Sequence, residues 1–285
     1  MINLDDNRKH VIFMVDPGIA ETADISINDF VEKAGNALHQ ALCFSPILQG
    51  KLVFHACIGE RRDSLRVQSK THLLPSAENF FNVVGQNEEA GVIQTGAILA
   101  AVEKISETYH LNETHRPIFI FLTDKPLKSL TRRGNIQPYG HSQMNTYAIV
   151  STSAFQKNRE MTDQEVKTFL TVLVHEFGHV LGAEKDRNDT RNNLGPHCVC
   201  PDCVMQQTDD FSAIAKKRRQ DVSPFCENCR ESILRHAEHV TGQTKEELLA
   251  LPMVKPVIVR KIAAGFKGEL SLPEMESLLN VSKPR

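Results

Sequence analysis

Three features are missing from this sequence, and each absence argues against a class of protein. No stretch approaches the about 18 apolar residues that a membrane-spanning helix needs, so we expect no membrane partner. Residues 1–15 do not have the pattern of a secretory signal, so we expect a cytoplasmic protein. The formal net charge is only -2, with 33 basic and 35 acidic side chains, so we expect no nucleic-acid partner.

The order of the apolar segments predicts an α/β (α+β) fold. At 285 residues the chain is long enough for one large core, alone or with an appendage. Strand-like runs alternate with helix-like stretches, which is typical of a twisted mixed β-sheet with crossover helices. The strand-like runs lie at 9–15, 51–58, 116–123 and 145–155, and the helix-like stretches lie at 27–42 and 92–109.

A further helix is predicted to end at about Gly182. Thr162 and Glu165 have the spacing of a capping box, in which each side chain satisfies a backbone group at a helix start. Apolar residues then recur at helical spacing as far as Gly182, a residue type that commonly follows a last helical turn because it tolerates positive φ. His175 and His179 therefore belong to the last turns of a buried helix.

The sequence His175-Glu176-Phe177-Gly178-His179 predicts a zinc site on this helix. Residues four apart share one helix face, with Cβ atoms about 5–6 Å apart, which suits two imidazoles that bind one tetrahedral ion. Glu176 is offset from that face and can accept a proton from a zinc-bound water, whose pKa the metal lowers to about 7. The pattern indicates a metal-dependent hydrolase with Glu176 as the catalytic residue.

The residues themselves leave the third zinc ligand open between His197 and Asp186. A third histidine three positions after Gly182 would stand where the chain has Lys185, a poor ligand. The longer connection to His197 costs about 2 kcal/mol of loop entropy. That cost is small beside the roughly 10–16 kcal/mol that a structural zinc contributes. We favour His197 and keep Asp186 as the alternative, because both residue types bind catalytic zinc.

The cysteines are odd in number and mostly clustered. In a chain without a secretion signal, this distribution favours thiolate metal ligation over a disulfide framework. Four thiolates would close a tetrahedral shell and leave no open position for chemistry, as in a structural zinc site. Five of the seven cysteines fall between 198 and 229 and two lie far away: Cys198, Cys200, Cys203, Cys226 and Cys229, then Cys43 and Cys57.

The order of these residues resembles the archaemetzincin signature, in which the third histidine directly precedes the first of four cysteines. The resemblance covers residues 162–229, and Leu194-Gly195-Pro196-His197-Cys198 is similar to bacterial members with a long loop before that histidine. It implies a metzincin-like fold and a zinc metallopeptidase that cuts peptide or protein substrates. It also implies one catalytic zinc at His175, His179 and His197, Glu176 as general base, a Met-turn at Met205, and one structural zinc at Cys198, Cys203, Cys226 and Cys229.

This sequence departs from the family pattern in three places. The loop at 183–196 is extra, the gap between Met205 and Cys226 is longer, and Cys200 is additional. The extra loop bears most directly on the choice of third ligand. The role of Cys200 is open.

The chain is predicted to divide near residue 230. Residues 1–230 would form the catalytic domain, with the structural zinc site at 198–229, and residues 231–285 a small helical extension in which helix-start signals recur. We expect His236 and His239 in this extension to be exposed, and we do not assign His141 to the site.

Two rival functions use the same residues differently. A catalytically silent, zinc-stabilised binding protein would keep both metal centres without hydrolysis, and the intact Glu176 argues against it. A nucleic-acid-binding zinc ribbon would be centred on residues 198–229, and the near-neutral charge argues against it. Two zinc ions per chain would fit the peptidase, and a single cysteine-bound zinc would fit the ribbon.

Overall fold

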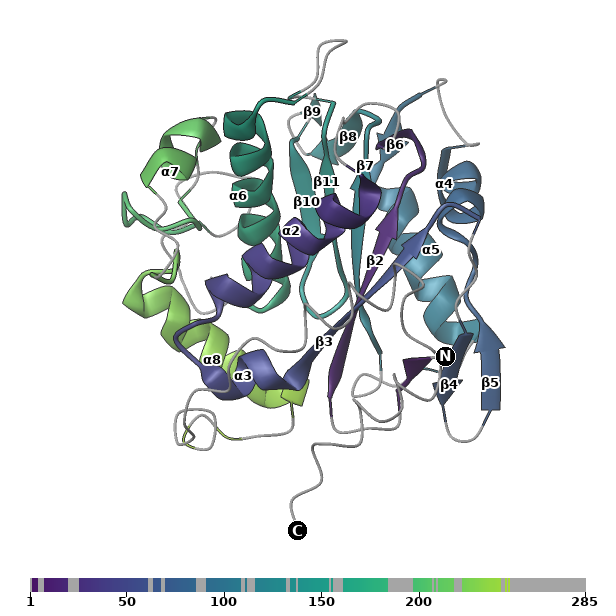
Figure 1. Ribbon diagram of the computed structural model, residues 1–285, viewed down its shortest axis with the longest axis horizontal. Helices are drawn as coiled ribbons and strands as arrows, with labels where there is room; N and C mark the ends of the chain where they lie inside the picture. Colours follow the sequence, from purple (N-terminus) through teal and green to yellow (C-terminus); the bar gives the residue numbers. More distant parts are fainter. Residues whose placement is uncertain are drawn as a thin grey trace.

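The structure is a computed structural model, shown as a ribbon in Figure 1. It describes residues 2–4, 8–19, 26–60, 64–67, 70–85, 91–108, 111, 116–131, 134–136, 138–153, 155, 161–183, 197–206, 208, 210–217, 222–241, 244 and 246. The alternative ligand Asp186 lies outside these residues, as does most of the predicted extension at 231–285. The proposed domain division at residue 230 stays a prediction.

The central sheet consists of β2 (Lys9–Val15), β3 (Leu52–Ile58), β7 (Ile118–Thr123), β10 (Gly140–Gln143) and β11 (Tyr147–Ser151). Their order is β10-β11-β7-β2-β3. The edge strand β10 is antiparallel to β11. The remaining four strands run parallel to one another. The mixed α/β sheet predicted from the alternating segments is confirmed, but the sequence patterns did not reveal β10.

Two apolar cores lie on the two faces of this sheet. Successive side chains of a strand point to opposite faces, so Val11 and Phe13 belong to one core and Ile12 and Met14 to the other. Helices cover both faces (Figure 1). The helices α2 (Ile27–Ala41) and α6 (Asp163–Val180) pack on the first face, and α4 (Ala77–Gly85) and α5 (Thr95–Thr108) on the second.

Shorter elements surround this framework. Two small sheets have the orders β1-β4-β5 and β6-β8-β9, and none of the helices among the described residues is long and apolar enough to cross a bilayer. The bounds are β1 (Ile2–Asn3), β4 (Ser64–Val67), β5 (Lys70–Leu73), β6 (Ile93–Gln94), β8 (Leu127–Thr131), β9 (Gly134–Ile136), α3 (Pro46–Lys51), α7 (Phe211–Lys217) and α8 (Glu227–Thr241).

Both predicted ends of α6 are confirmed. The Thr162 hydroxyl accepts a hydrogen bond from the Glu165 backbone N–H at 3.3 Å, and the Glu165 carboxylate accepts one from the Thr162 backbone N–H at 2.7 Å. At the other end Gly182 has φ +76°, and the Ala183 N–H donates to the Gly178 carbonyl at 2.9 Å. This pairing closes the helix in a Schellman motif, which turns the chain sharply at its end.

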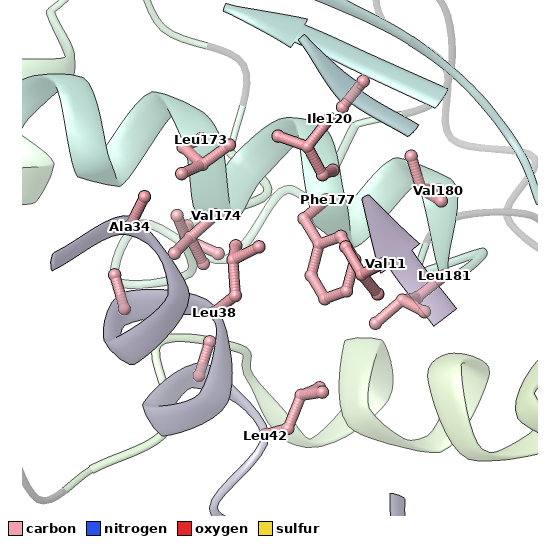
Figure 2. Packing of buried hydrophobic residues seen from close by; sticks show 14 of the residues in the cluster. Val11, Ala34, Leu38, Leu42, Ile120, Leu173, Val174, Phe177, Val180 and Leu181 are labelled. Carbon is pink, nitrogen blue, oxygen red and sulfur yellow. The ribbon is translucent and has the colours of Figure 1, made fainter. Parts of the chain in front are cut away.

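The apolar side of α6 fixes the helix against the sheet. Figure 2 shows Val174 and Phe177 directed toward Leu38 of α2 and Val11 of β2, and all four are fully buried. Fully burying one such side chain contributes about 1.5–3 kcal/mol. The adjacent His175 and Glu176 are therefore held on a helix with little freedom to move.

A substitution at Gly178 tests how closely Met205 and Phe225 pack against α6. A Cβ at this position would meet the Met205 Sδ atom and would lie 2.8 Å from Cε1 of Phe225. Gly to Ala inside a helix usually stabilises by about 1 kcal/mol. We expect Gly178→Ala instead to lower the free energy of unfolding by about 1–3 kcal/mol through overpacking, as measured by urea denaturation.

Gly96→Ala is the matched control for this substitution. Gly96 is exposed in α5, and nothing lies within 4 Å of its added Cβ. Its variant should be as stable as the wild type or slightly more stable. Equal stability of Gly178→Ala and the wild type would show that Met205 does not pack under the motif helix.

Candidate metal centres

Three histidines converge at the end of α6. One ring nitrogen from each of His175, His179 and His197 lies within 4.8 Å of the others, and the Nε2 atoms of His175 and His179 are 3.2 Å apart. Zinc–nitrogen bonds of about 2.0–2.1 Å at tetrahedral angles separate two ligand nitrogens by about 3.3 Å. The histidine group has the residue types and spacing to hold one metal ion.

The orientation of His175 is set by a backbone carbonyl. Its Nδ1 lies 2.7 Å from the carbonyl oxygen of Val204, and both groups are buried. Because a carbonyl only accepts, Nδ1 carries the hydrogen and Nε2 keeps its lone pair toward the other two histidines. A metal-binding histidine usually donates the N–H of its other ring nitrogen to a carbonyl or carboxylate in this way.

Burial also keeps the imidazoles of His175 and His179 neutral. It lowers the pKa of His175 to about 4, although the hydrogen bond to Val204 partly opposes this shift. The pKa of His179 is lowered well below its usual value, mainly by burial and further by the charges of His175 and His197. Neutral imidazole is the form that binds metal, so the pocket favours ligand-competent side chains at neutral pH.

Glu176 lies beside the histidines with one defined partner. Its side chain is buried, at 8% exposure, and the Ser142 hydroxyl donates to Oε2 at 2.6 Å. Burial raises the pKa of Glu176 to about 7, and the hydrogen bond from Ser142 opposes part of that rise. The carboxyl group can therefore take up and release a proton near neutral pH.

The strand that contacts Glu176 is β10. Gly140 and Ser142 on β10 face Glu176. The predicted run at 145–155 contains β11, which is the neighbour of β10 in the sheet. Four residues, Gly-His-Ser-Gln, carry no apolar alternation, so no strand pattern identified β10.

Two residues left out of the predicted site lie near it. His141 on β10 has its Nδ1 3.0 Å from the Tyr147 hydroxyl, and its charge contributes to the lowered pKa of His179. Tyr139 packs edge-on against Phe211 at 5.9 Å between ring centroids, and Phe211 in turn packs against His175 at 5.2 Å. Burial lowers the pKa of His141 as well.

The four predicted cysteines form a second group. Their sulfur atoms all lie within 4.8 Å of one another. Separations are 3.6 Å for Cys198 and Cys226, 3.5 Å for Cys203 and Cys229, and 3.5 Å for Cys226 and Cys229, and these four cysteines form no disulfide. Zinc–sulfur bonds of about 2.3 Å at tetrahedral angles would give about 3.8 Å. The geometry fits a tetrahedral metal site and excludes a disulfide in this structure.

Hydrogen bonds in this group favour the thiolate form of Cys198. Thiol hydrogen bonds, first that of Cys203, lower the pKa of Cys198, and the same contact raises the pKa of Cys203. The Cys200 backbone N–H donates to Cys198 Sγ at 3.4 Å, and the Cys226 backbone N–H donates to Cys203 Sγ at 3.3 Å. The Cys200 side chain is not one of the four, and it is partly exposed.

Met205 contacts both Cys198 and the motif helix. It is fully buried, its carbonyl accepts from the Cys198 N–H at 2.8 Å, and its sulfur contacts the Gly178 side of α6. The predicted Met-turn role of Met205 beneath the catalytic metal stays a prediction.

No protein-family model matches the chain, and no curated protein matches it. Among solved structures, the chain is similar to archaemetzincin from Methanopyrus kandleri, with 15% sequence identity and a TM-score of 0.47. The match covers 82% of this chain and 98% of that chain. A similarity of this size assigns neither a fold nor a function.

The opposite pKa shifts of His175 and Glu176 predict how stability depends on pH when a chelator keeps metal off the histidines. Unfolded His175 binds a proton near pH 6.5 and the folded form near pH 4, so acidification through this window favours unfolding. Glu176 holds its proton below about pH 7 when folded and below 4.5 when unfolded, so acidification favours folding there. The two contributions oppose each other between about pH 4.5 and 6.5.

Glu176→Gln removes only the second contribution. The variant should therefore lose stability on acidification more steeply than the wild type over that window, by about 1.4 kcal/mol per pH unit for one proton. Urea unfolding at several pH values in chelator-containing buffer measures the slope. Parallel curves for the two proteins would mean that Glu176 has no raised pKa.

Proposed function

We propose that the chain is a zinc-dependent metallopeptidase with an archaemetzincin-like pair of zinc centres, one catalytic and one structural. The observation that carries the proposal is the convergence of three imidazole nitrogens beside the buried carboxylate of Glu176. His175, His179 and Glu176 all belong to α6. Three neutral ligands leave a fourth position open for water or substrate, which is the arrangement of catalytic zinc.

His175, His179 and His197 would hold the catalytic ion, and the 3.2 Å spacing of two Nε2 atoms supports this ligand set. When bound, zinc supplies Lewis acidity, which polarises a substrate carbonyl and lowers the pKa of a coordinated water. The four cysteines would hold the structural ion with no open position, because four thiolates complete a tetrahedral shell.

Glu176 would act as general base and then as general acid. Its carboxylate takes a proton from the attacking water and returns it to the leaving amine, which a pKa of about 7 suits. Oε2 already accepts a hydrogen bond from the Ser142 hydroxyl, so Oε1 has more lone-pair capacity for this proton.

A peptide or protein substrate would bind along β10. This strand is at the end of the sheet order, and no strand among the described residues pairs with its outer edge. An extended peptide can add to such an edge through main-chain hydrogen bonds. Because Gly140 and Ser142 on this strand touch Glu176, a peptide bound there would pass the carboxylate.

Glu176→Gln tests the chemistry. Gln keeps the shape of the side chain but cannot take up the proton, so we expect normal zinc content and a loss of peptide hydrolysis of at least about 100-fold. A peptide library assayed beside metal analysis measures both. Wild-type turnover in this variant would contradict the mechanism, and two zinc ions without any wild-type hydrolysis would indicate the silent binding protein instead.

The third ligand is tested by metal content. His197→Ala should reduce bound zinc from about two ions to about one per chain, because the histidine site loses a third of its ligands. Asp186→Ala should keep both ions. The reverse result would assign the ligand to Asp186, and a loss of both ions in His197→Ala would mean that this residue also supports the cysteine centre.

A further inference from the structure

The Glu176 carboxylate is contacted by two residues of β10 that the proposed chemistry does not require as ligands or acids. Gly140 and Ser142 are two apart on a strand, so they project to the same face. The Ser142 hydroxyl donates to Oε2 at 2.6 Å. A Cβ on Gly140 would lie 2.6 Å from Cγ and 2.9 Å from Oε1 of Glu176. One carboxylate oxygen thus contacts the Ser142 hydroxyl, and the other lies beside the Cα of Gly140.

Each of the two contacts requires the residue type that is present at that position. A separation of 2.6 Å is that of a charge-assisted O–H···O⁻ hydrogen bond, which is roughly twice as strong as a neutral one. A real Cβ essentially never approaches a neighbouring atom as closely as 2.6 Å, so any side chain at Gly140 would displace Glu176. Ser142 is the hydrogen-bond partner that the described part of the chain gives to Glu176.

We propose that Ser142 and Gly140 are positioning residues for Glu176. The Ser142 hydroxyl holds Oε2 and so fixes the rotation of the carboxylate, while the bare Cα of Gly140 leaves the space that Oε1 occupies. The proposal rests on the proposed function for the role of Glu176 as base, but the contact itself exists independently of any activity.

The kinetic test uses the zinc-loaded protein and three variants. Ser142→Ala should keep the zinc content and KM for a peptide and lose about tenfold in kcat, which is the usual size for a residue that orients a reacting group. Ser142→Thr returns a hydroxyl and should restore most of kcat. Thr108→Ala, which deletes an exposed hydroxyl on α5 at the other face of the sheet, should change nothing.

Two kinetic results overturn the positioning role. One is a wild-type kcat in Ser142→Ala, and the other is a Thr variant no better than the Ala variant, since the hydroxyl would then not be the cause. Gly140→Ala provides an independent variant, and it should lower kcat while zinc content stays unchanged. A wild-type kcat in Gly140→Ala would remove that residue from the proposal.

A double-mutant cycle on stability tests the contact without any substrate. Ser142→Ala should lower the urea midpoint of the zinc-loaded protein when Glu176 is present and have little effect in a Glu176→Ala background. Equal shifts in both backgrounds overturn the contact. If the wild type cut no peptide, the proposed function would fail, whereas this cycle would still decide whether Ser142 holds Glu176.

Discussion

The hydrogen bond from His175 Nδ1 to the Val204 carbonyl joins the histidine group to the cysteine group, and the orientation of His175 depends on it. It spans 2.7 Å between the motif helix and the loop that carries the cysteines. Val204 directly follows Cys203, and its own N–H donates to the Pro224 carbonyl at 2.9 Å. The cysteine group therefore fixes the carbonyl that selects the tautomer of His175. The link between His197 and Cys198 in the chain adds a second connection of the same kind.

The same cysteine group also determines what lies beneath the end of α6. Cys226 and Cys229 stand at the start of α8, and Ser232 on α8 donates to the Gly182 carbonyl at 2.7 Å. A Cβ on Gly182 would lie 3.0 Å from the His236 ring, so the helix crosses at a distance that only glycine allows without adjustment. His236 is 7% exposed, which contradicts the expectation that it is exposed. It is buried because α8 packs under the turn that follows the motif.

The parts of the site that the sequence predicts are those with local signals. Thr162 and Glu165 mark a helix start through backbone groups three residues apart, so a short stretch is enough to identify it. The strand β10 has no such signal, because it becomes a strand only by pairing with β11. Ser142 was missed for that reason. No local pattern places its hydroxyl beside a carboxylate 34 positions later, since that neighbour is set by the packing of α6 on the sheet edge.

Burial acts in opposite directions on the two kinds of group in the histidine site. It lowers the pKa of His175 and so keeps the imidazole neutral, and it makes Glu176 hold a proton more strongly. A deeper pocket would leave the carboxyl group protonated at neutral pH, and a wetter one would make it a weak base. The hydrogen bond from Ser142 opposes the effect of burial on Glu176 without exposing the histidines. Because Ser142 belongs to the edge strand proposed to receive the peptide, a shift of β10 would change substrate position and the strength of the base together.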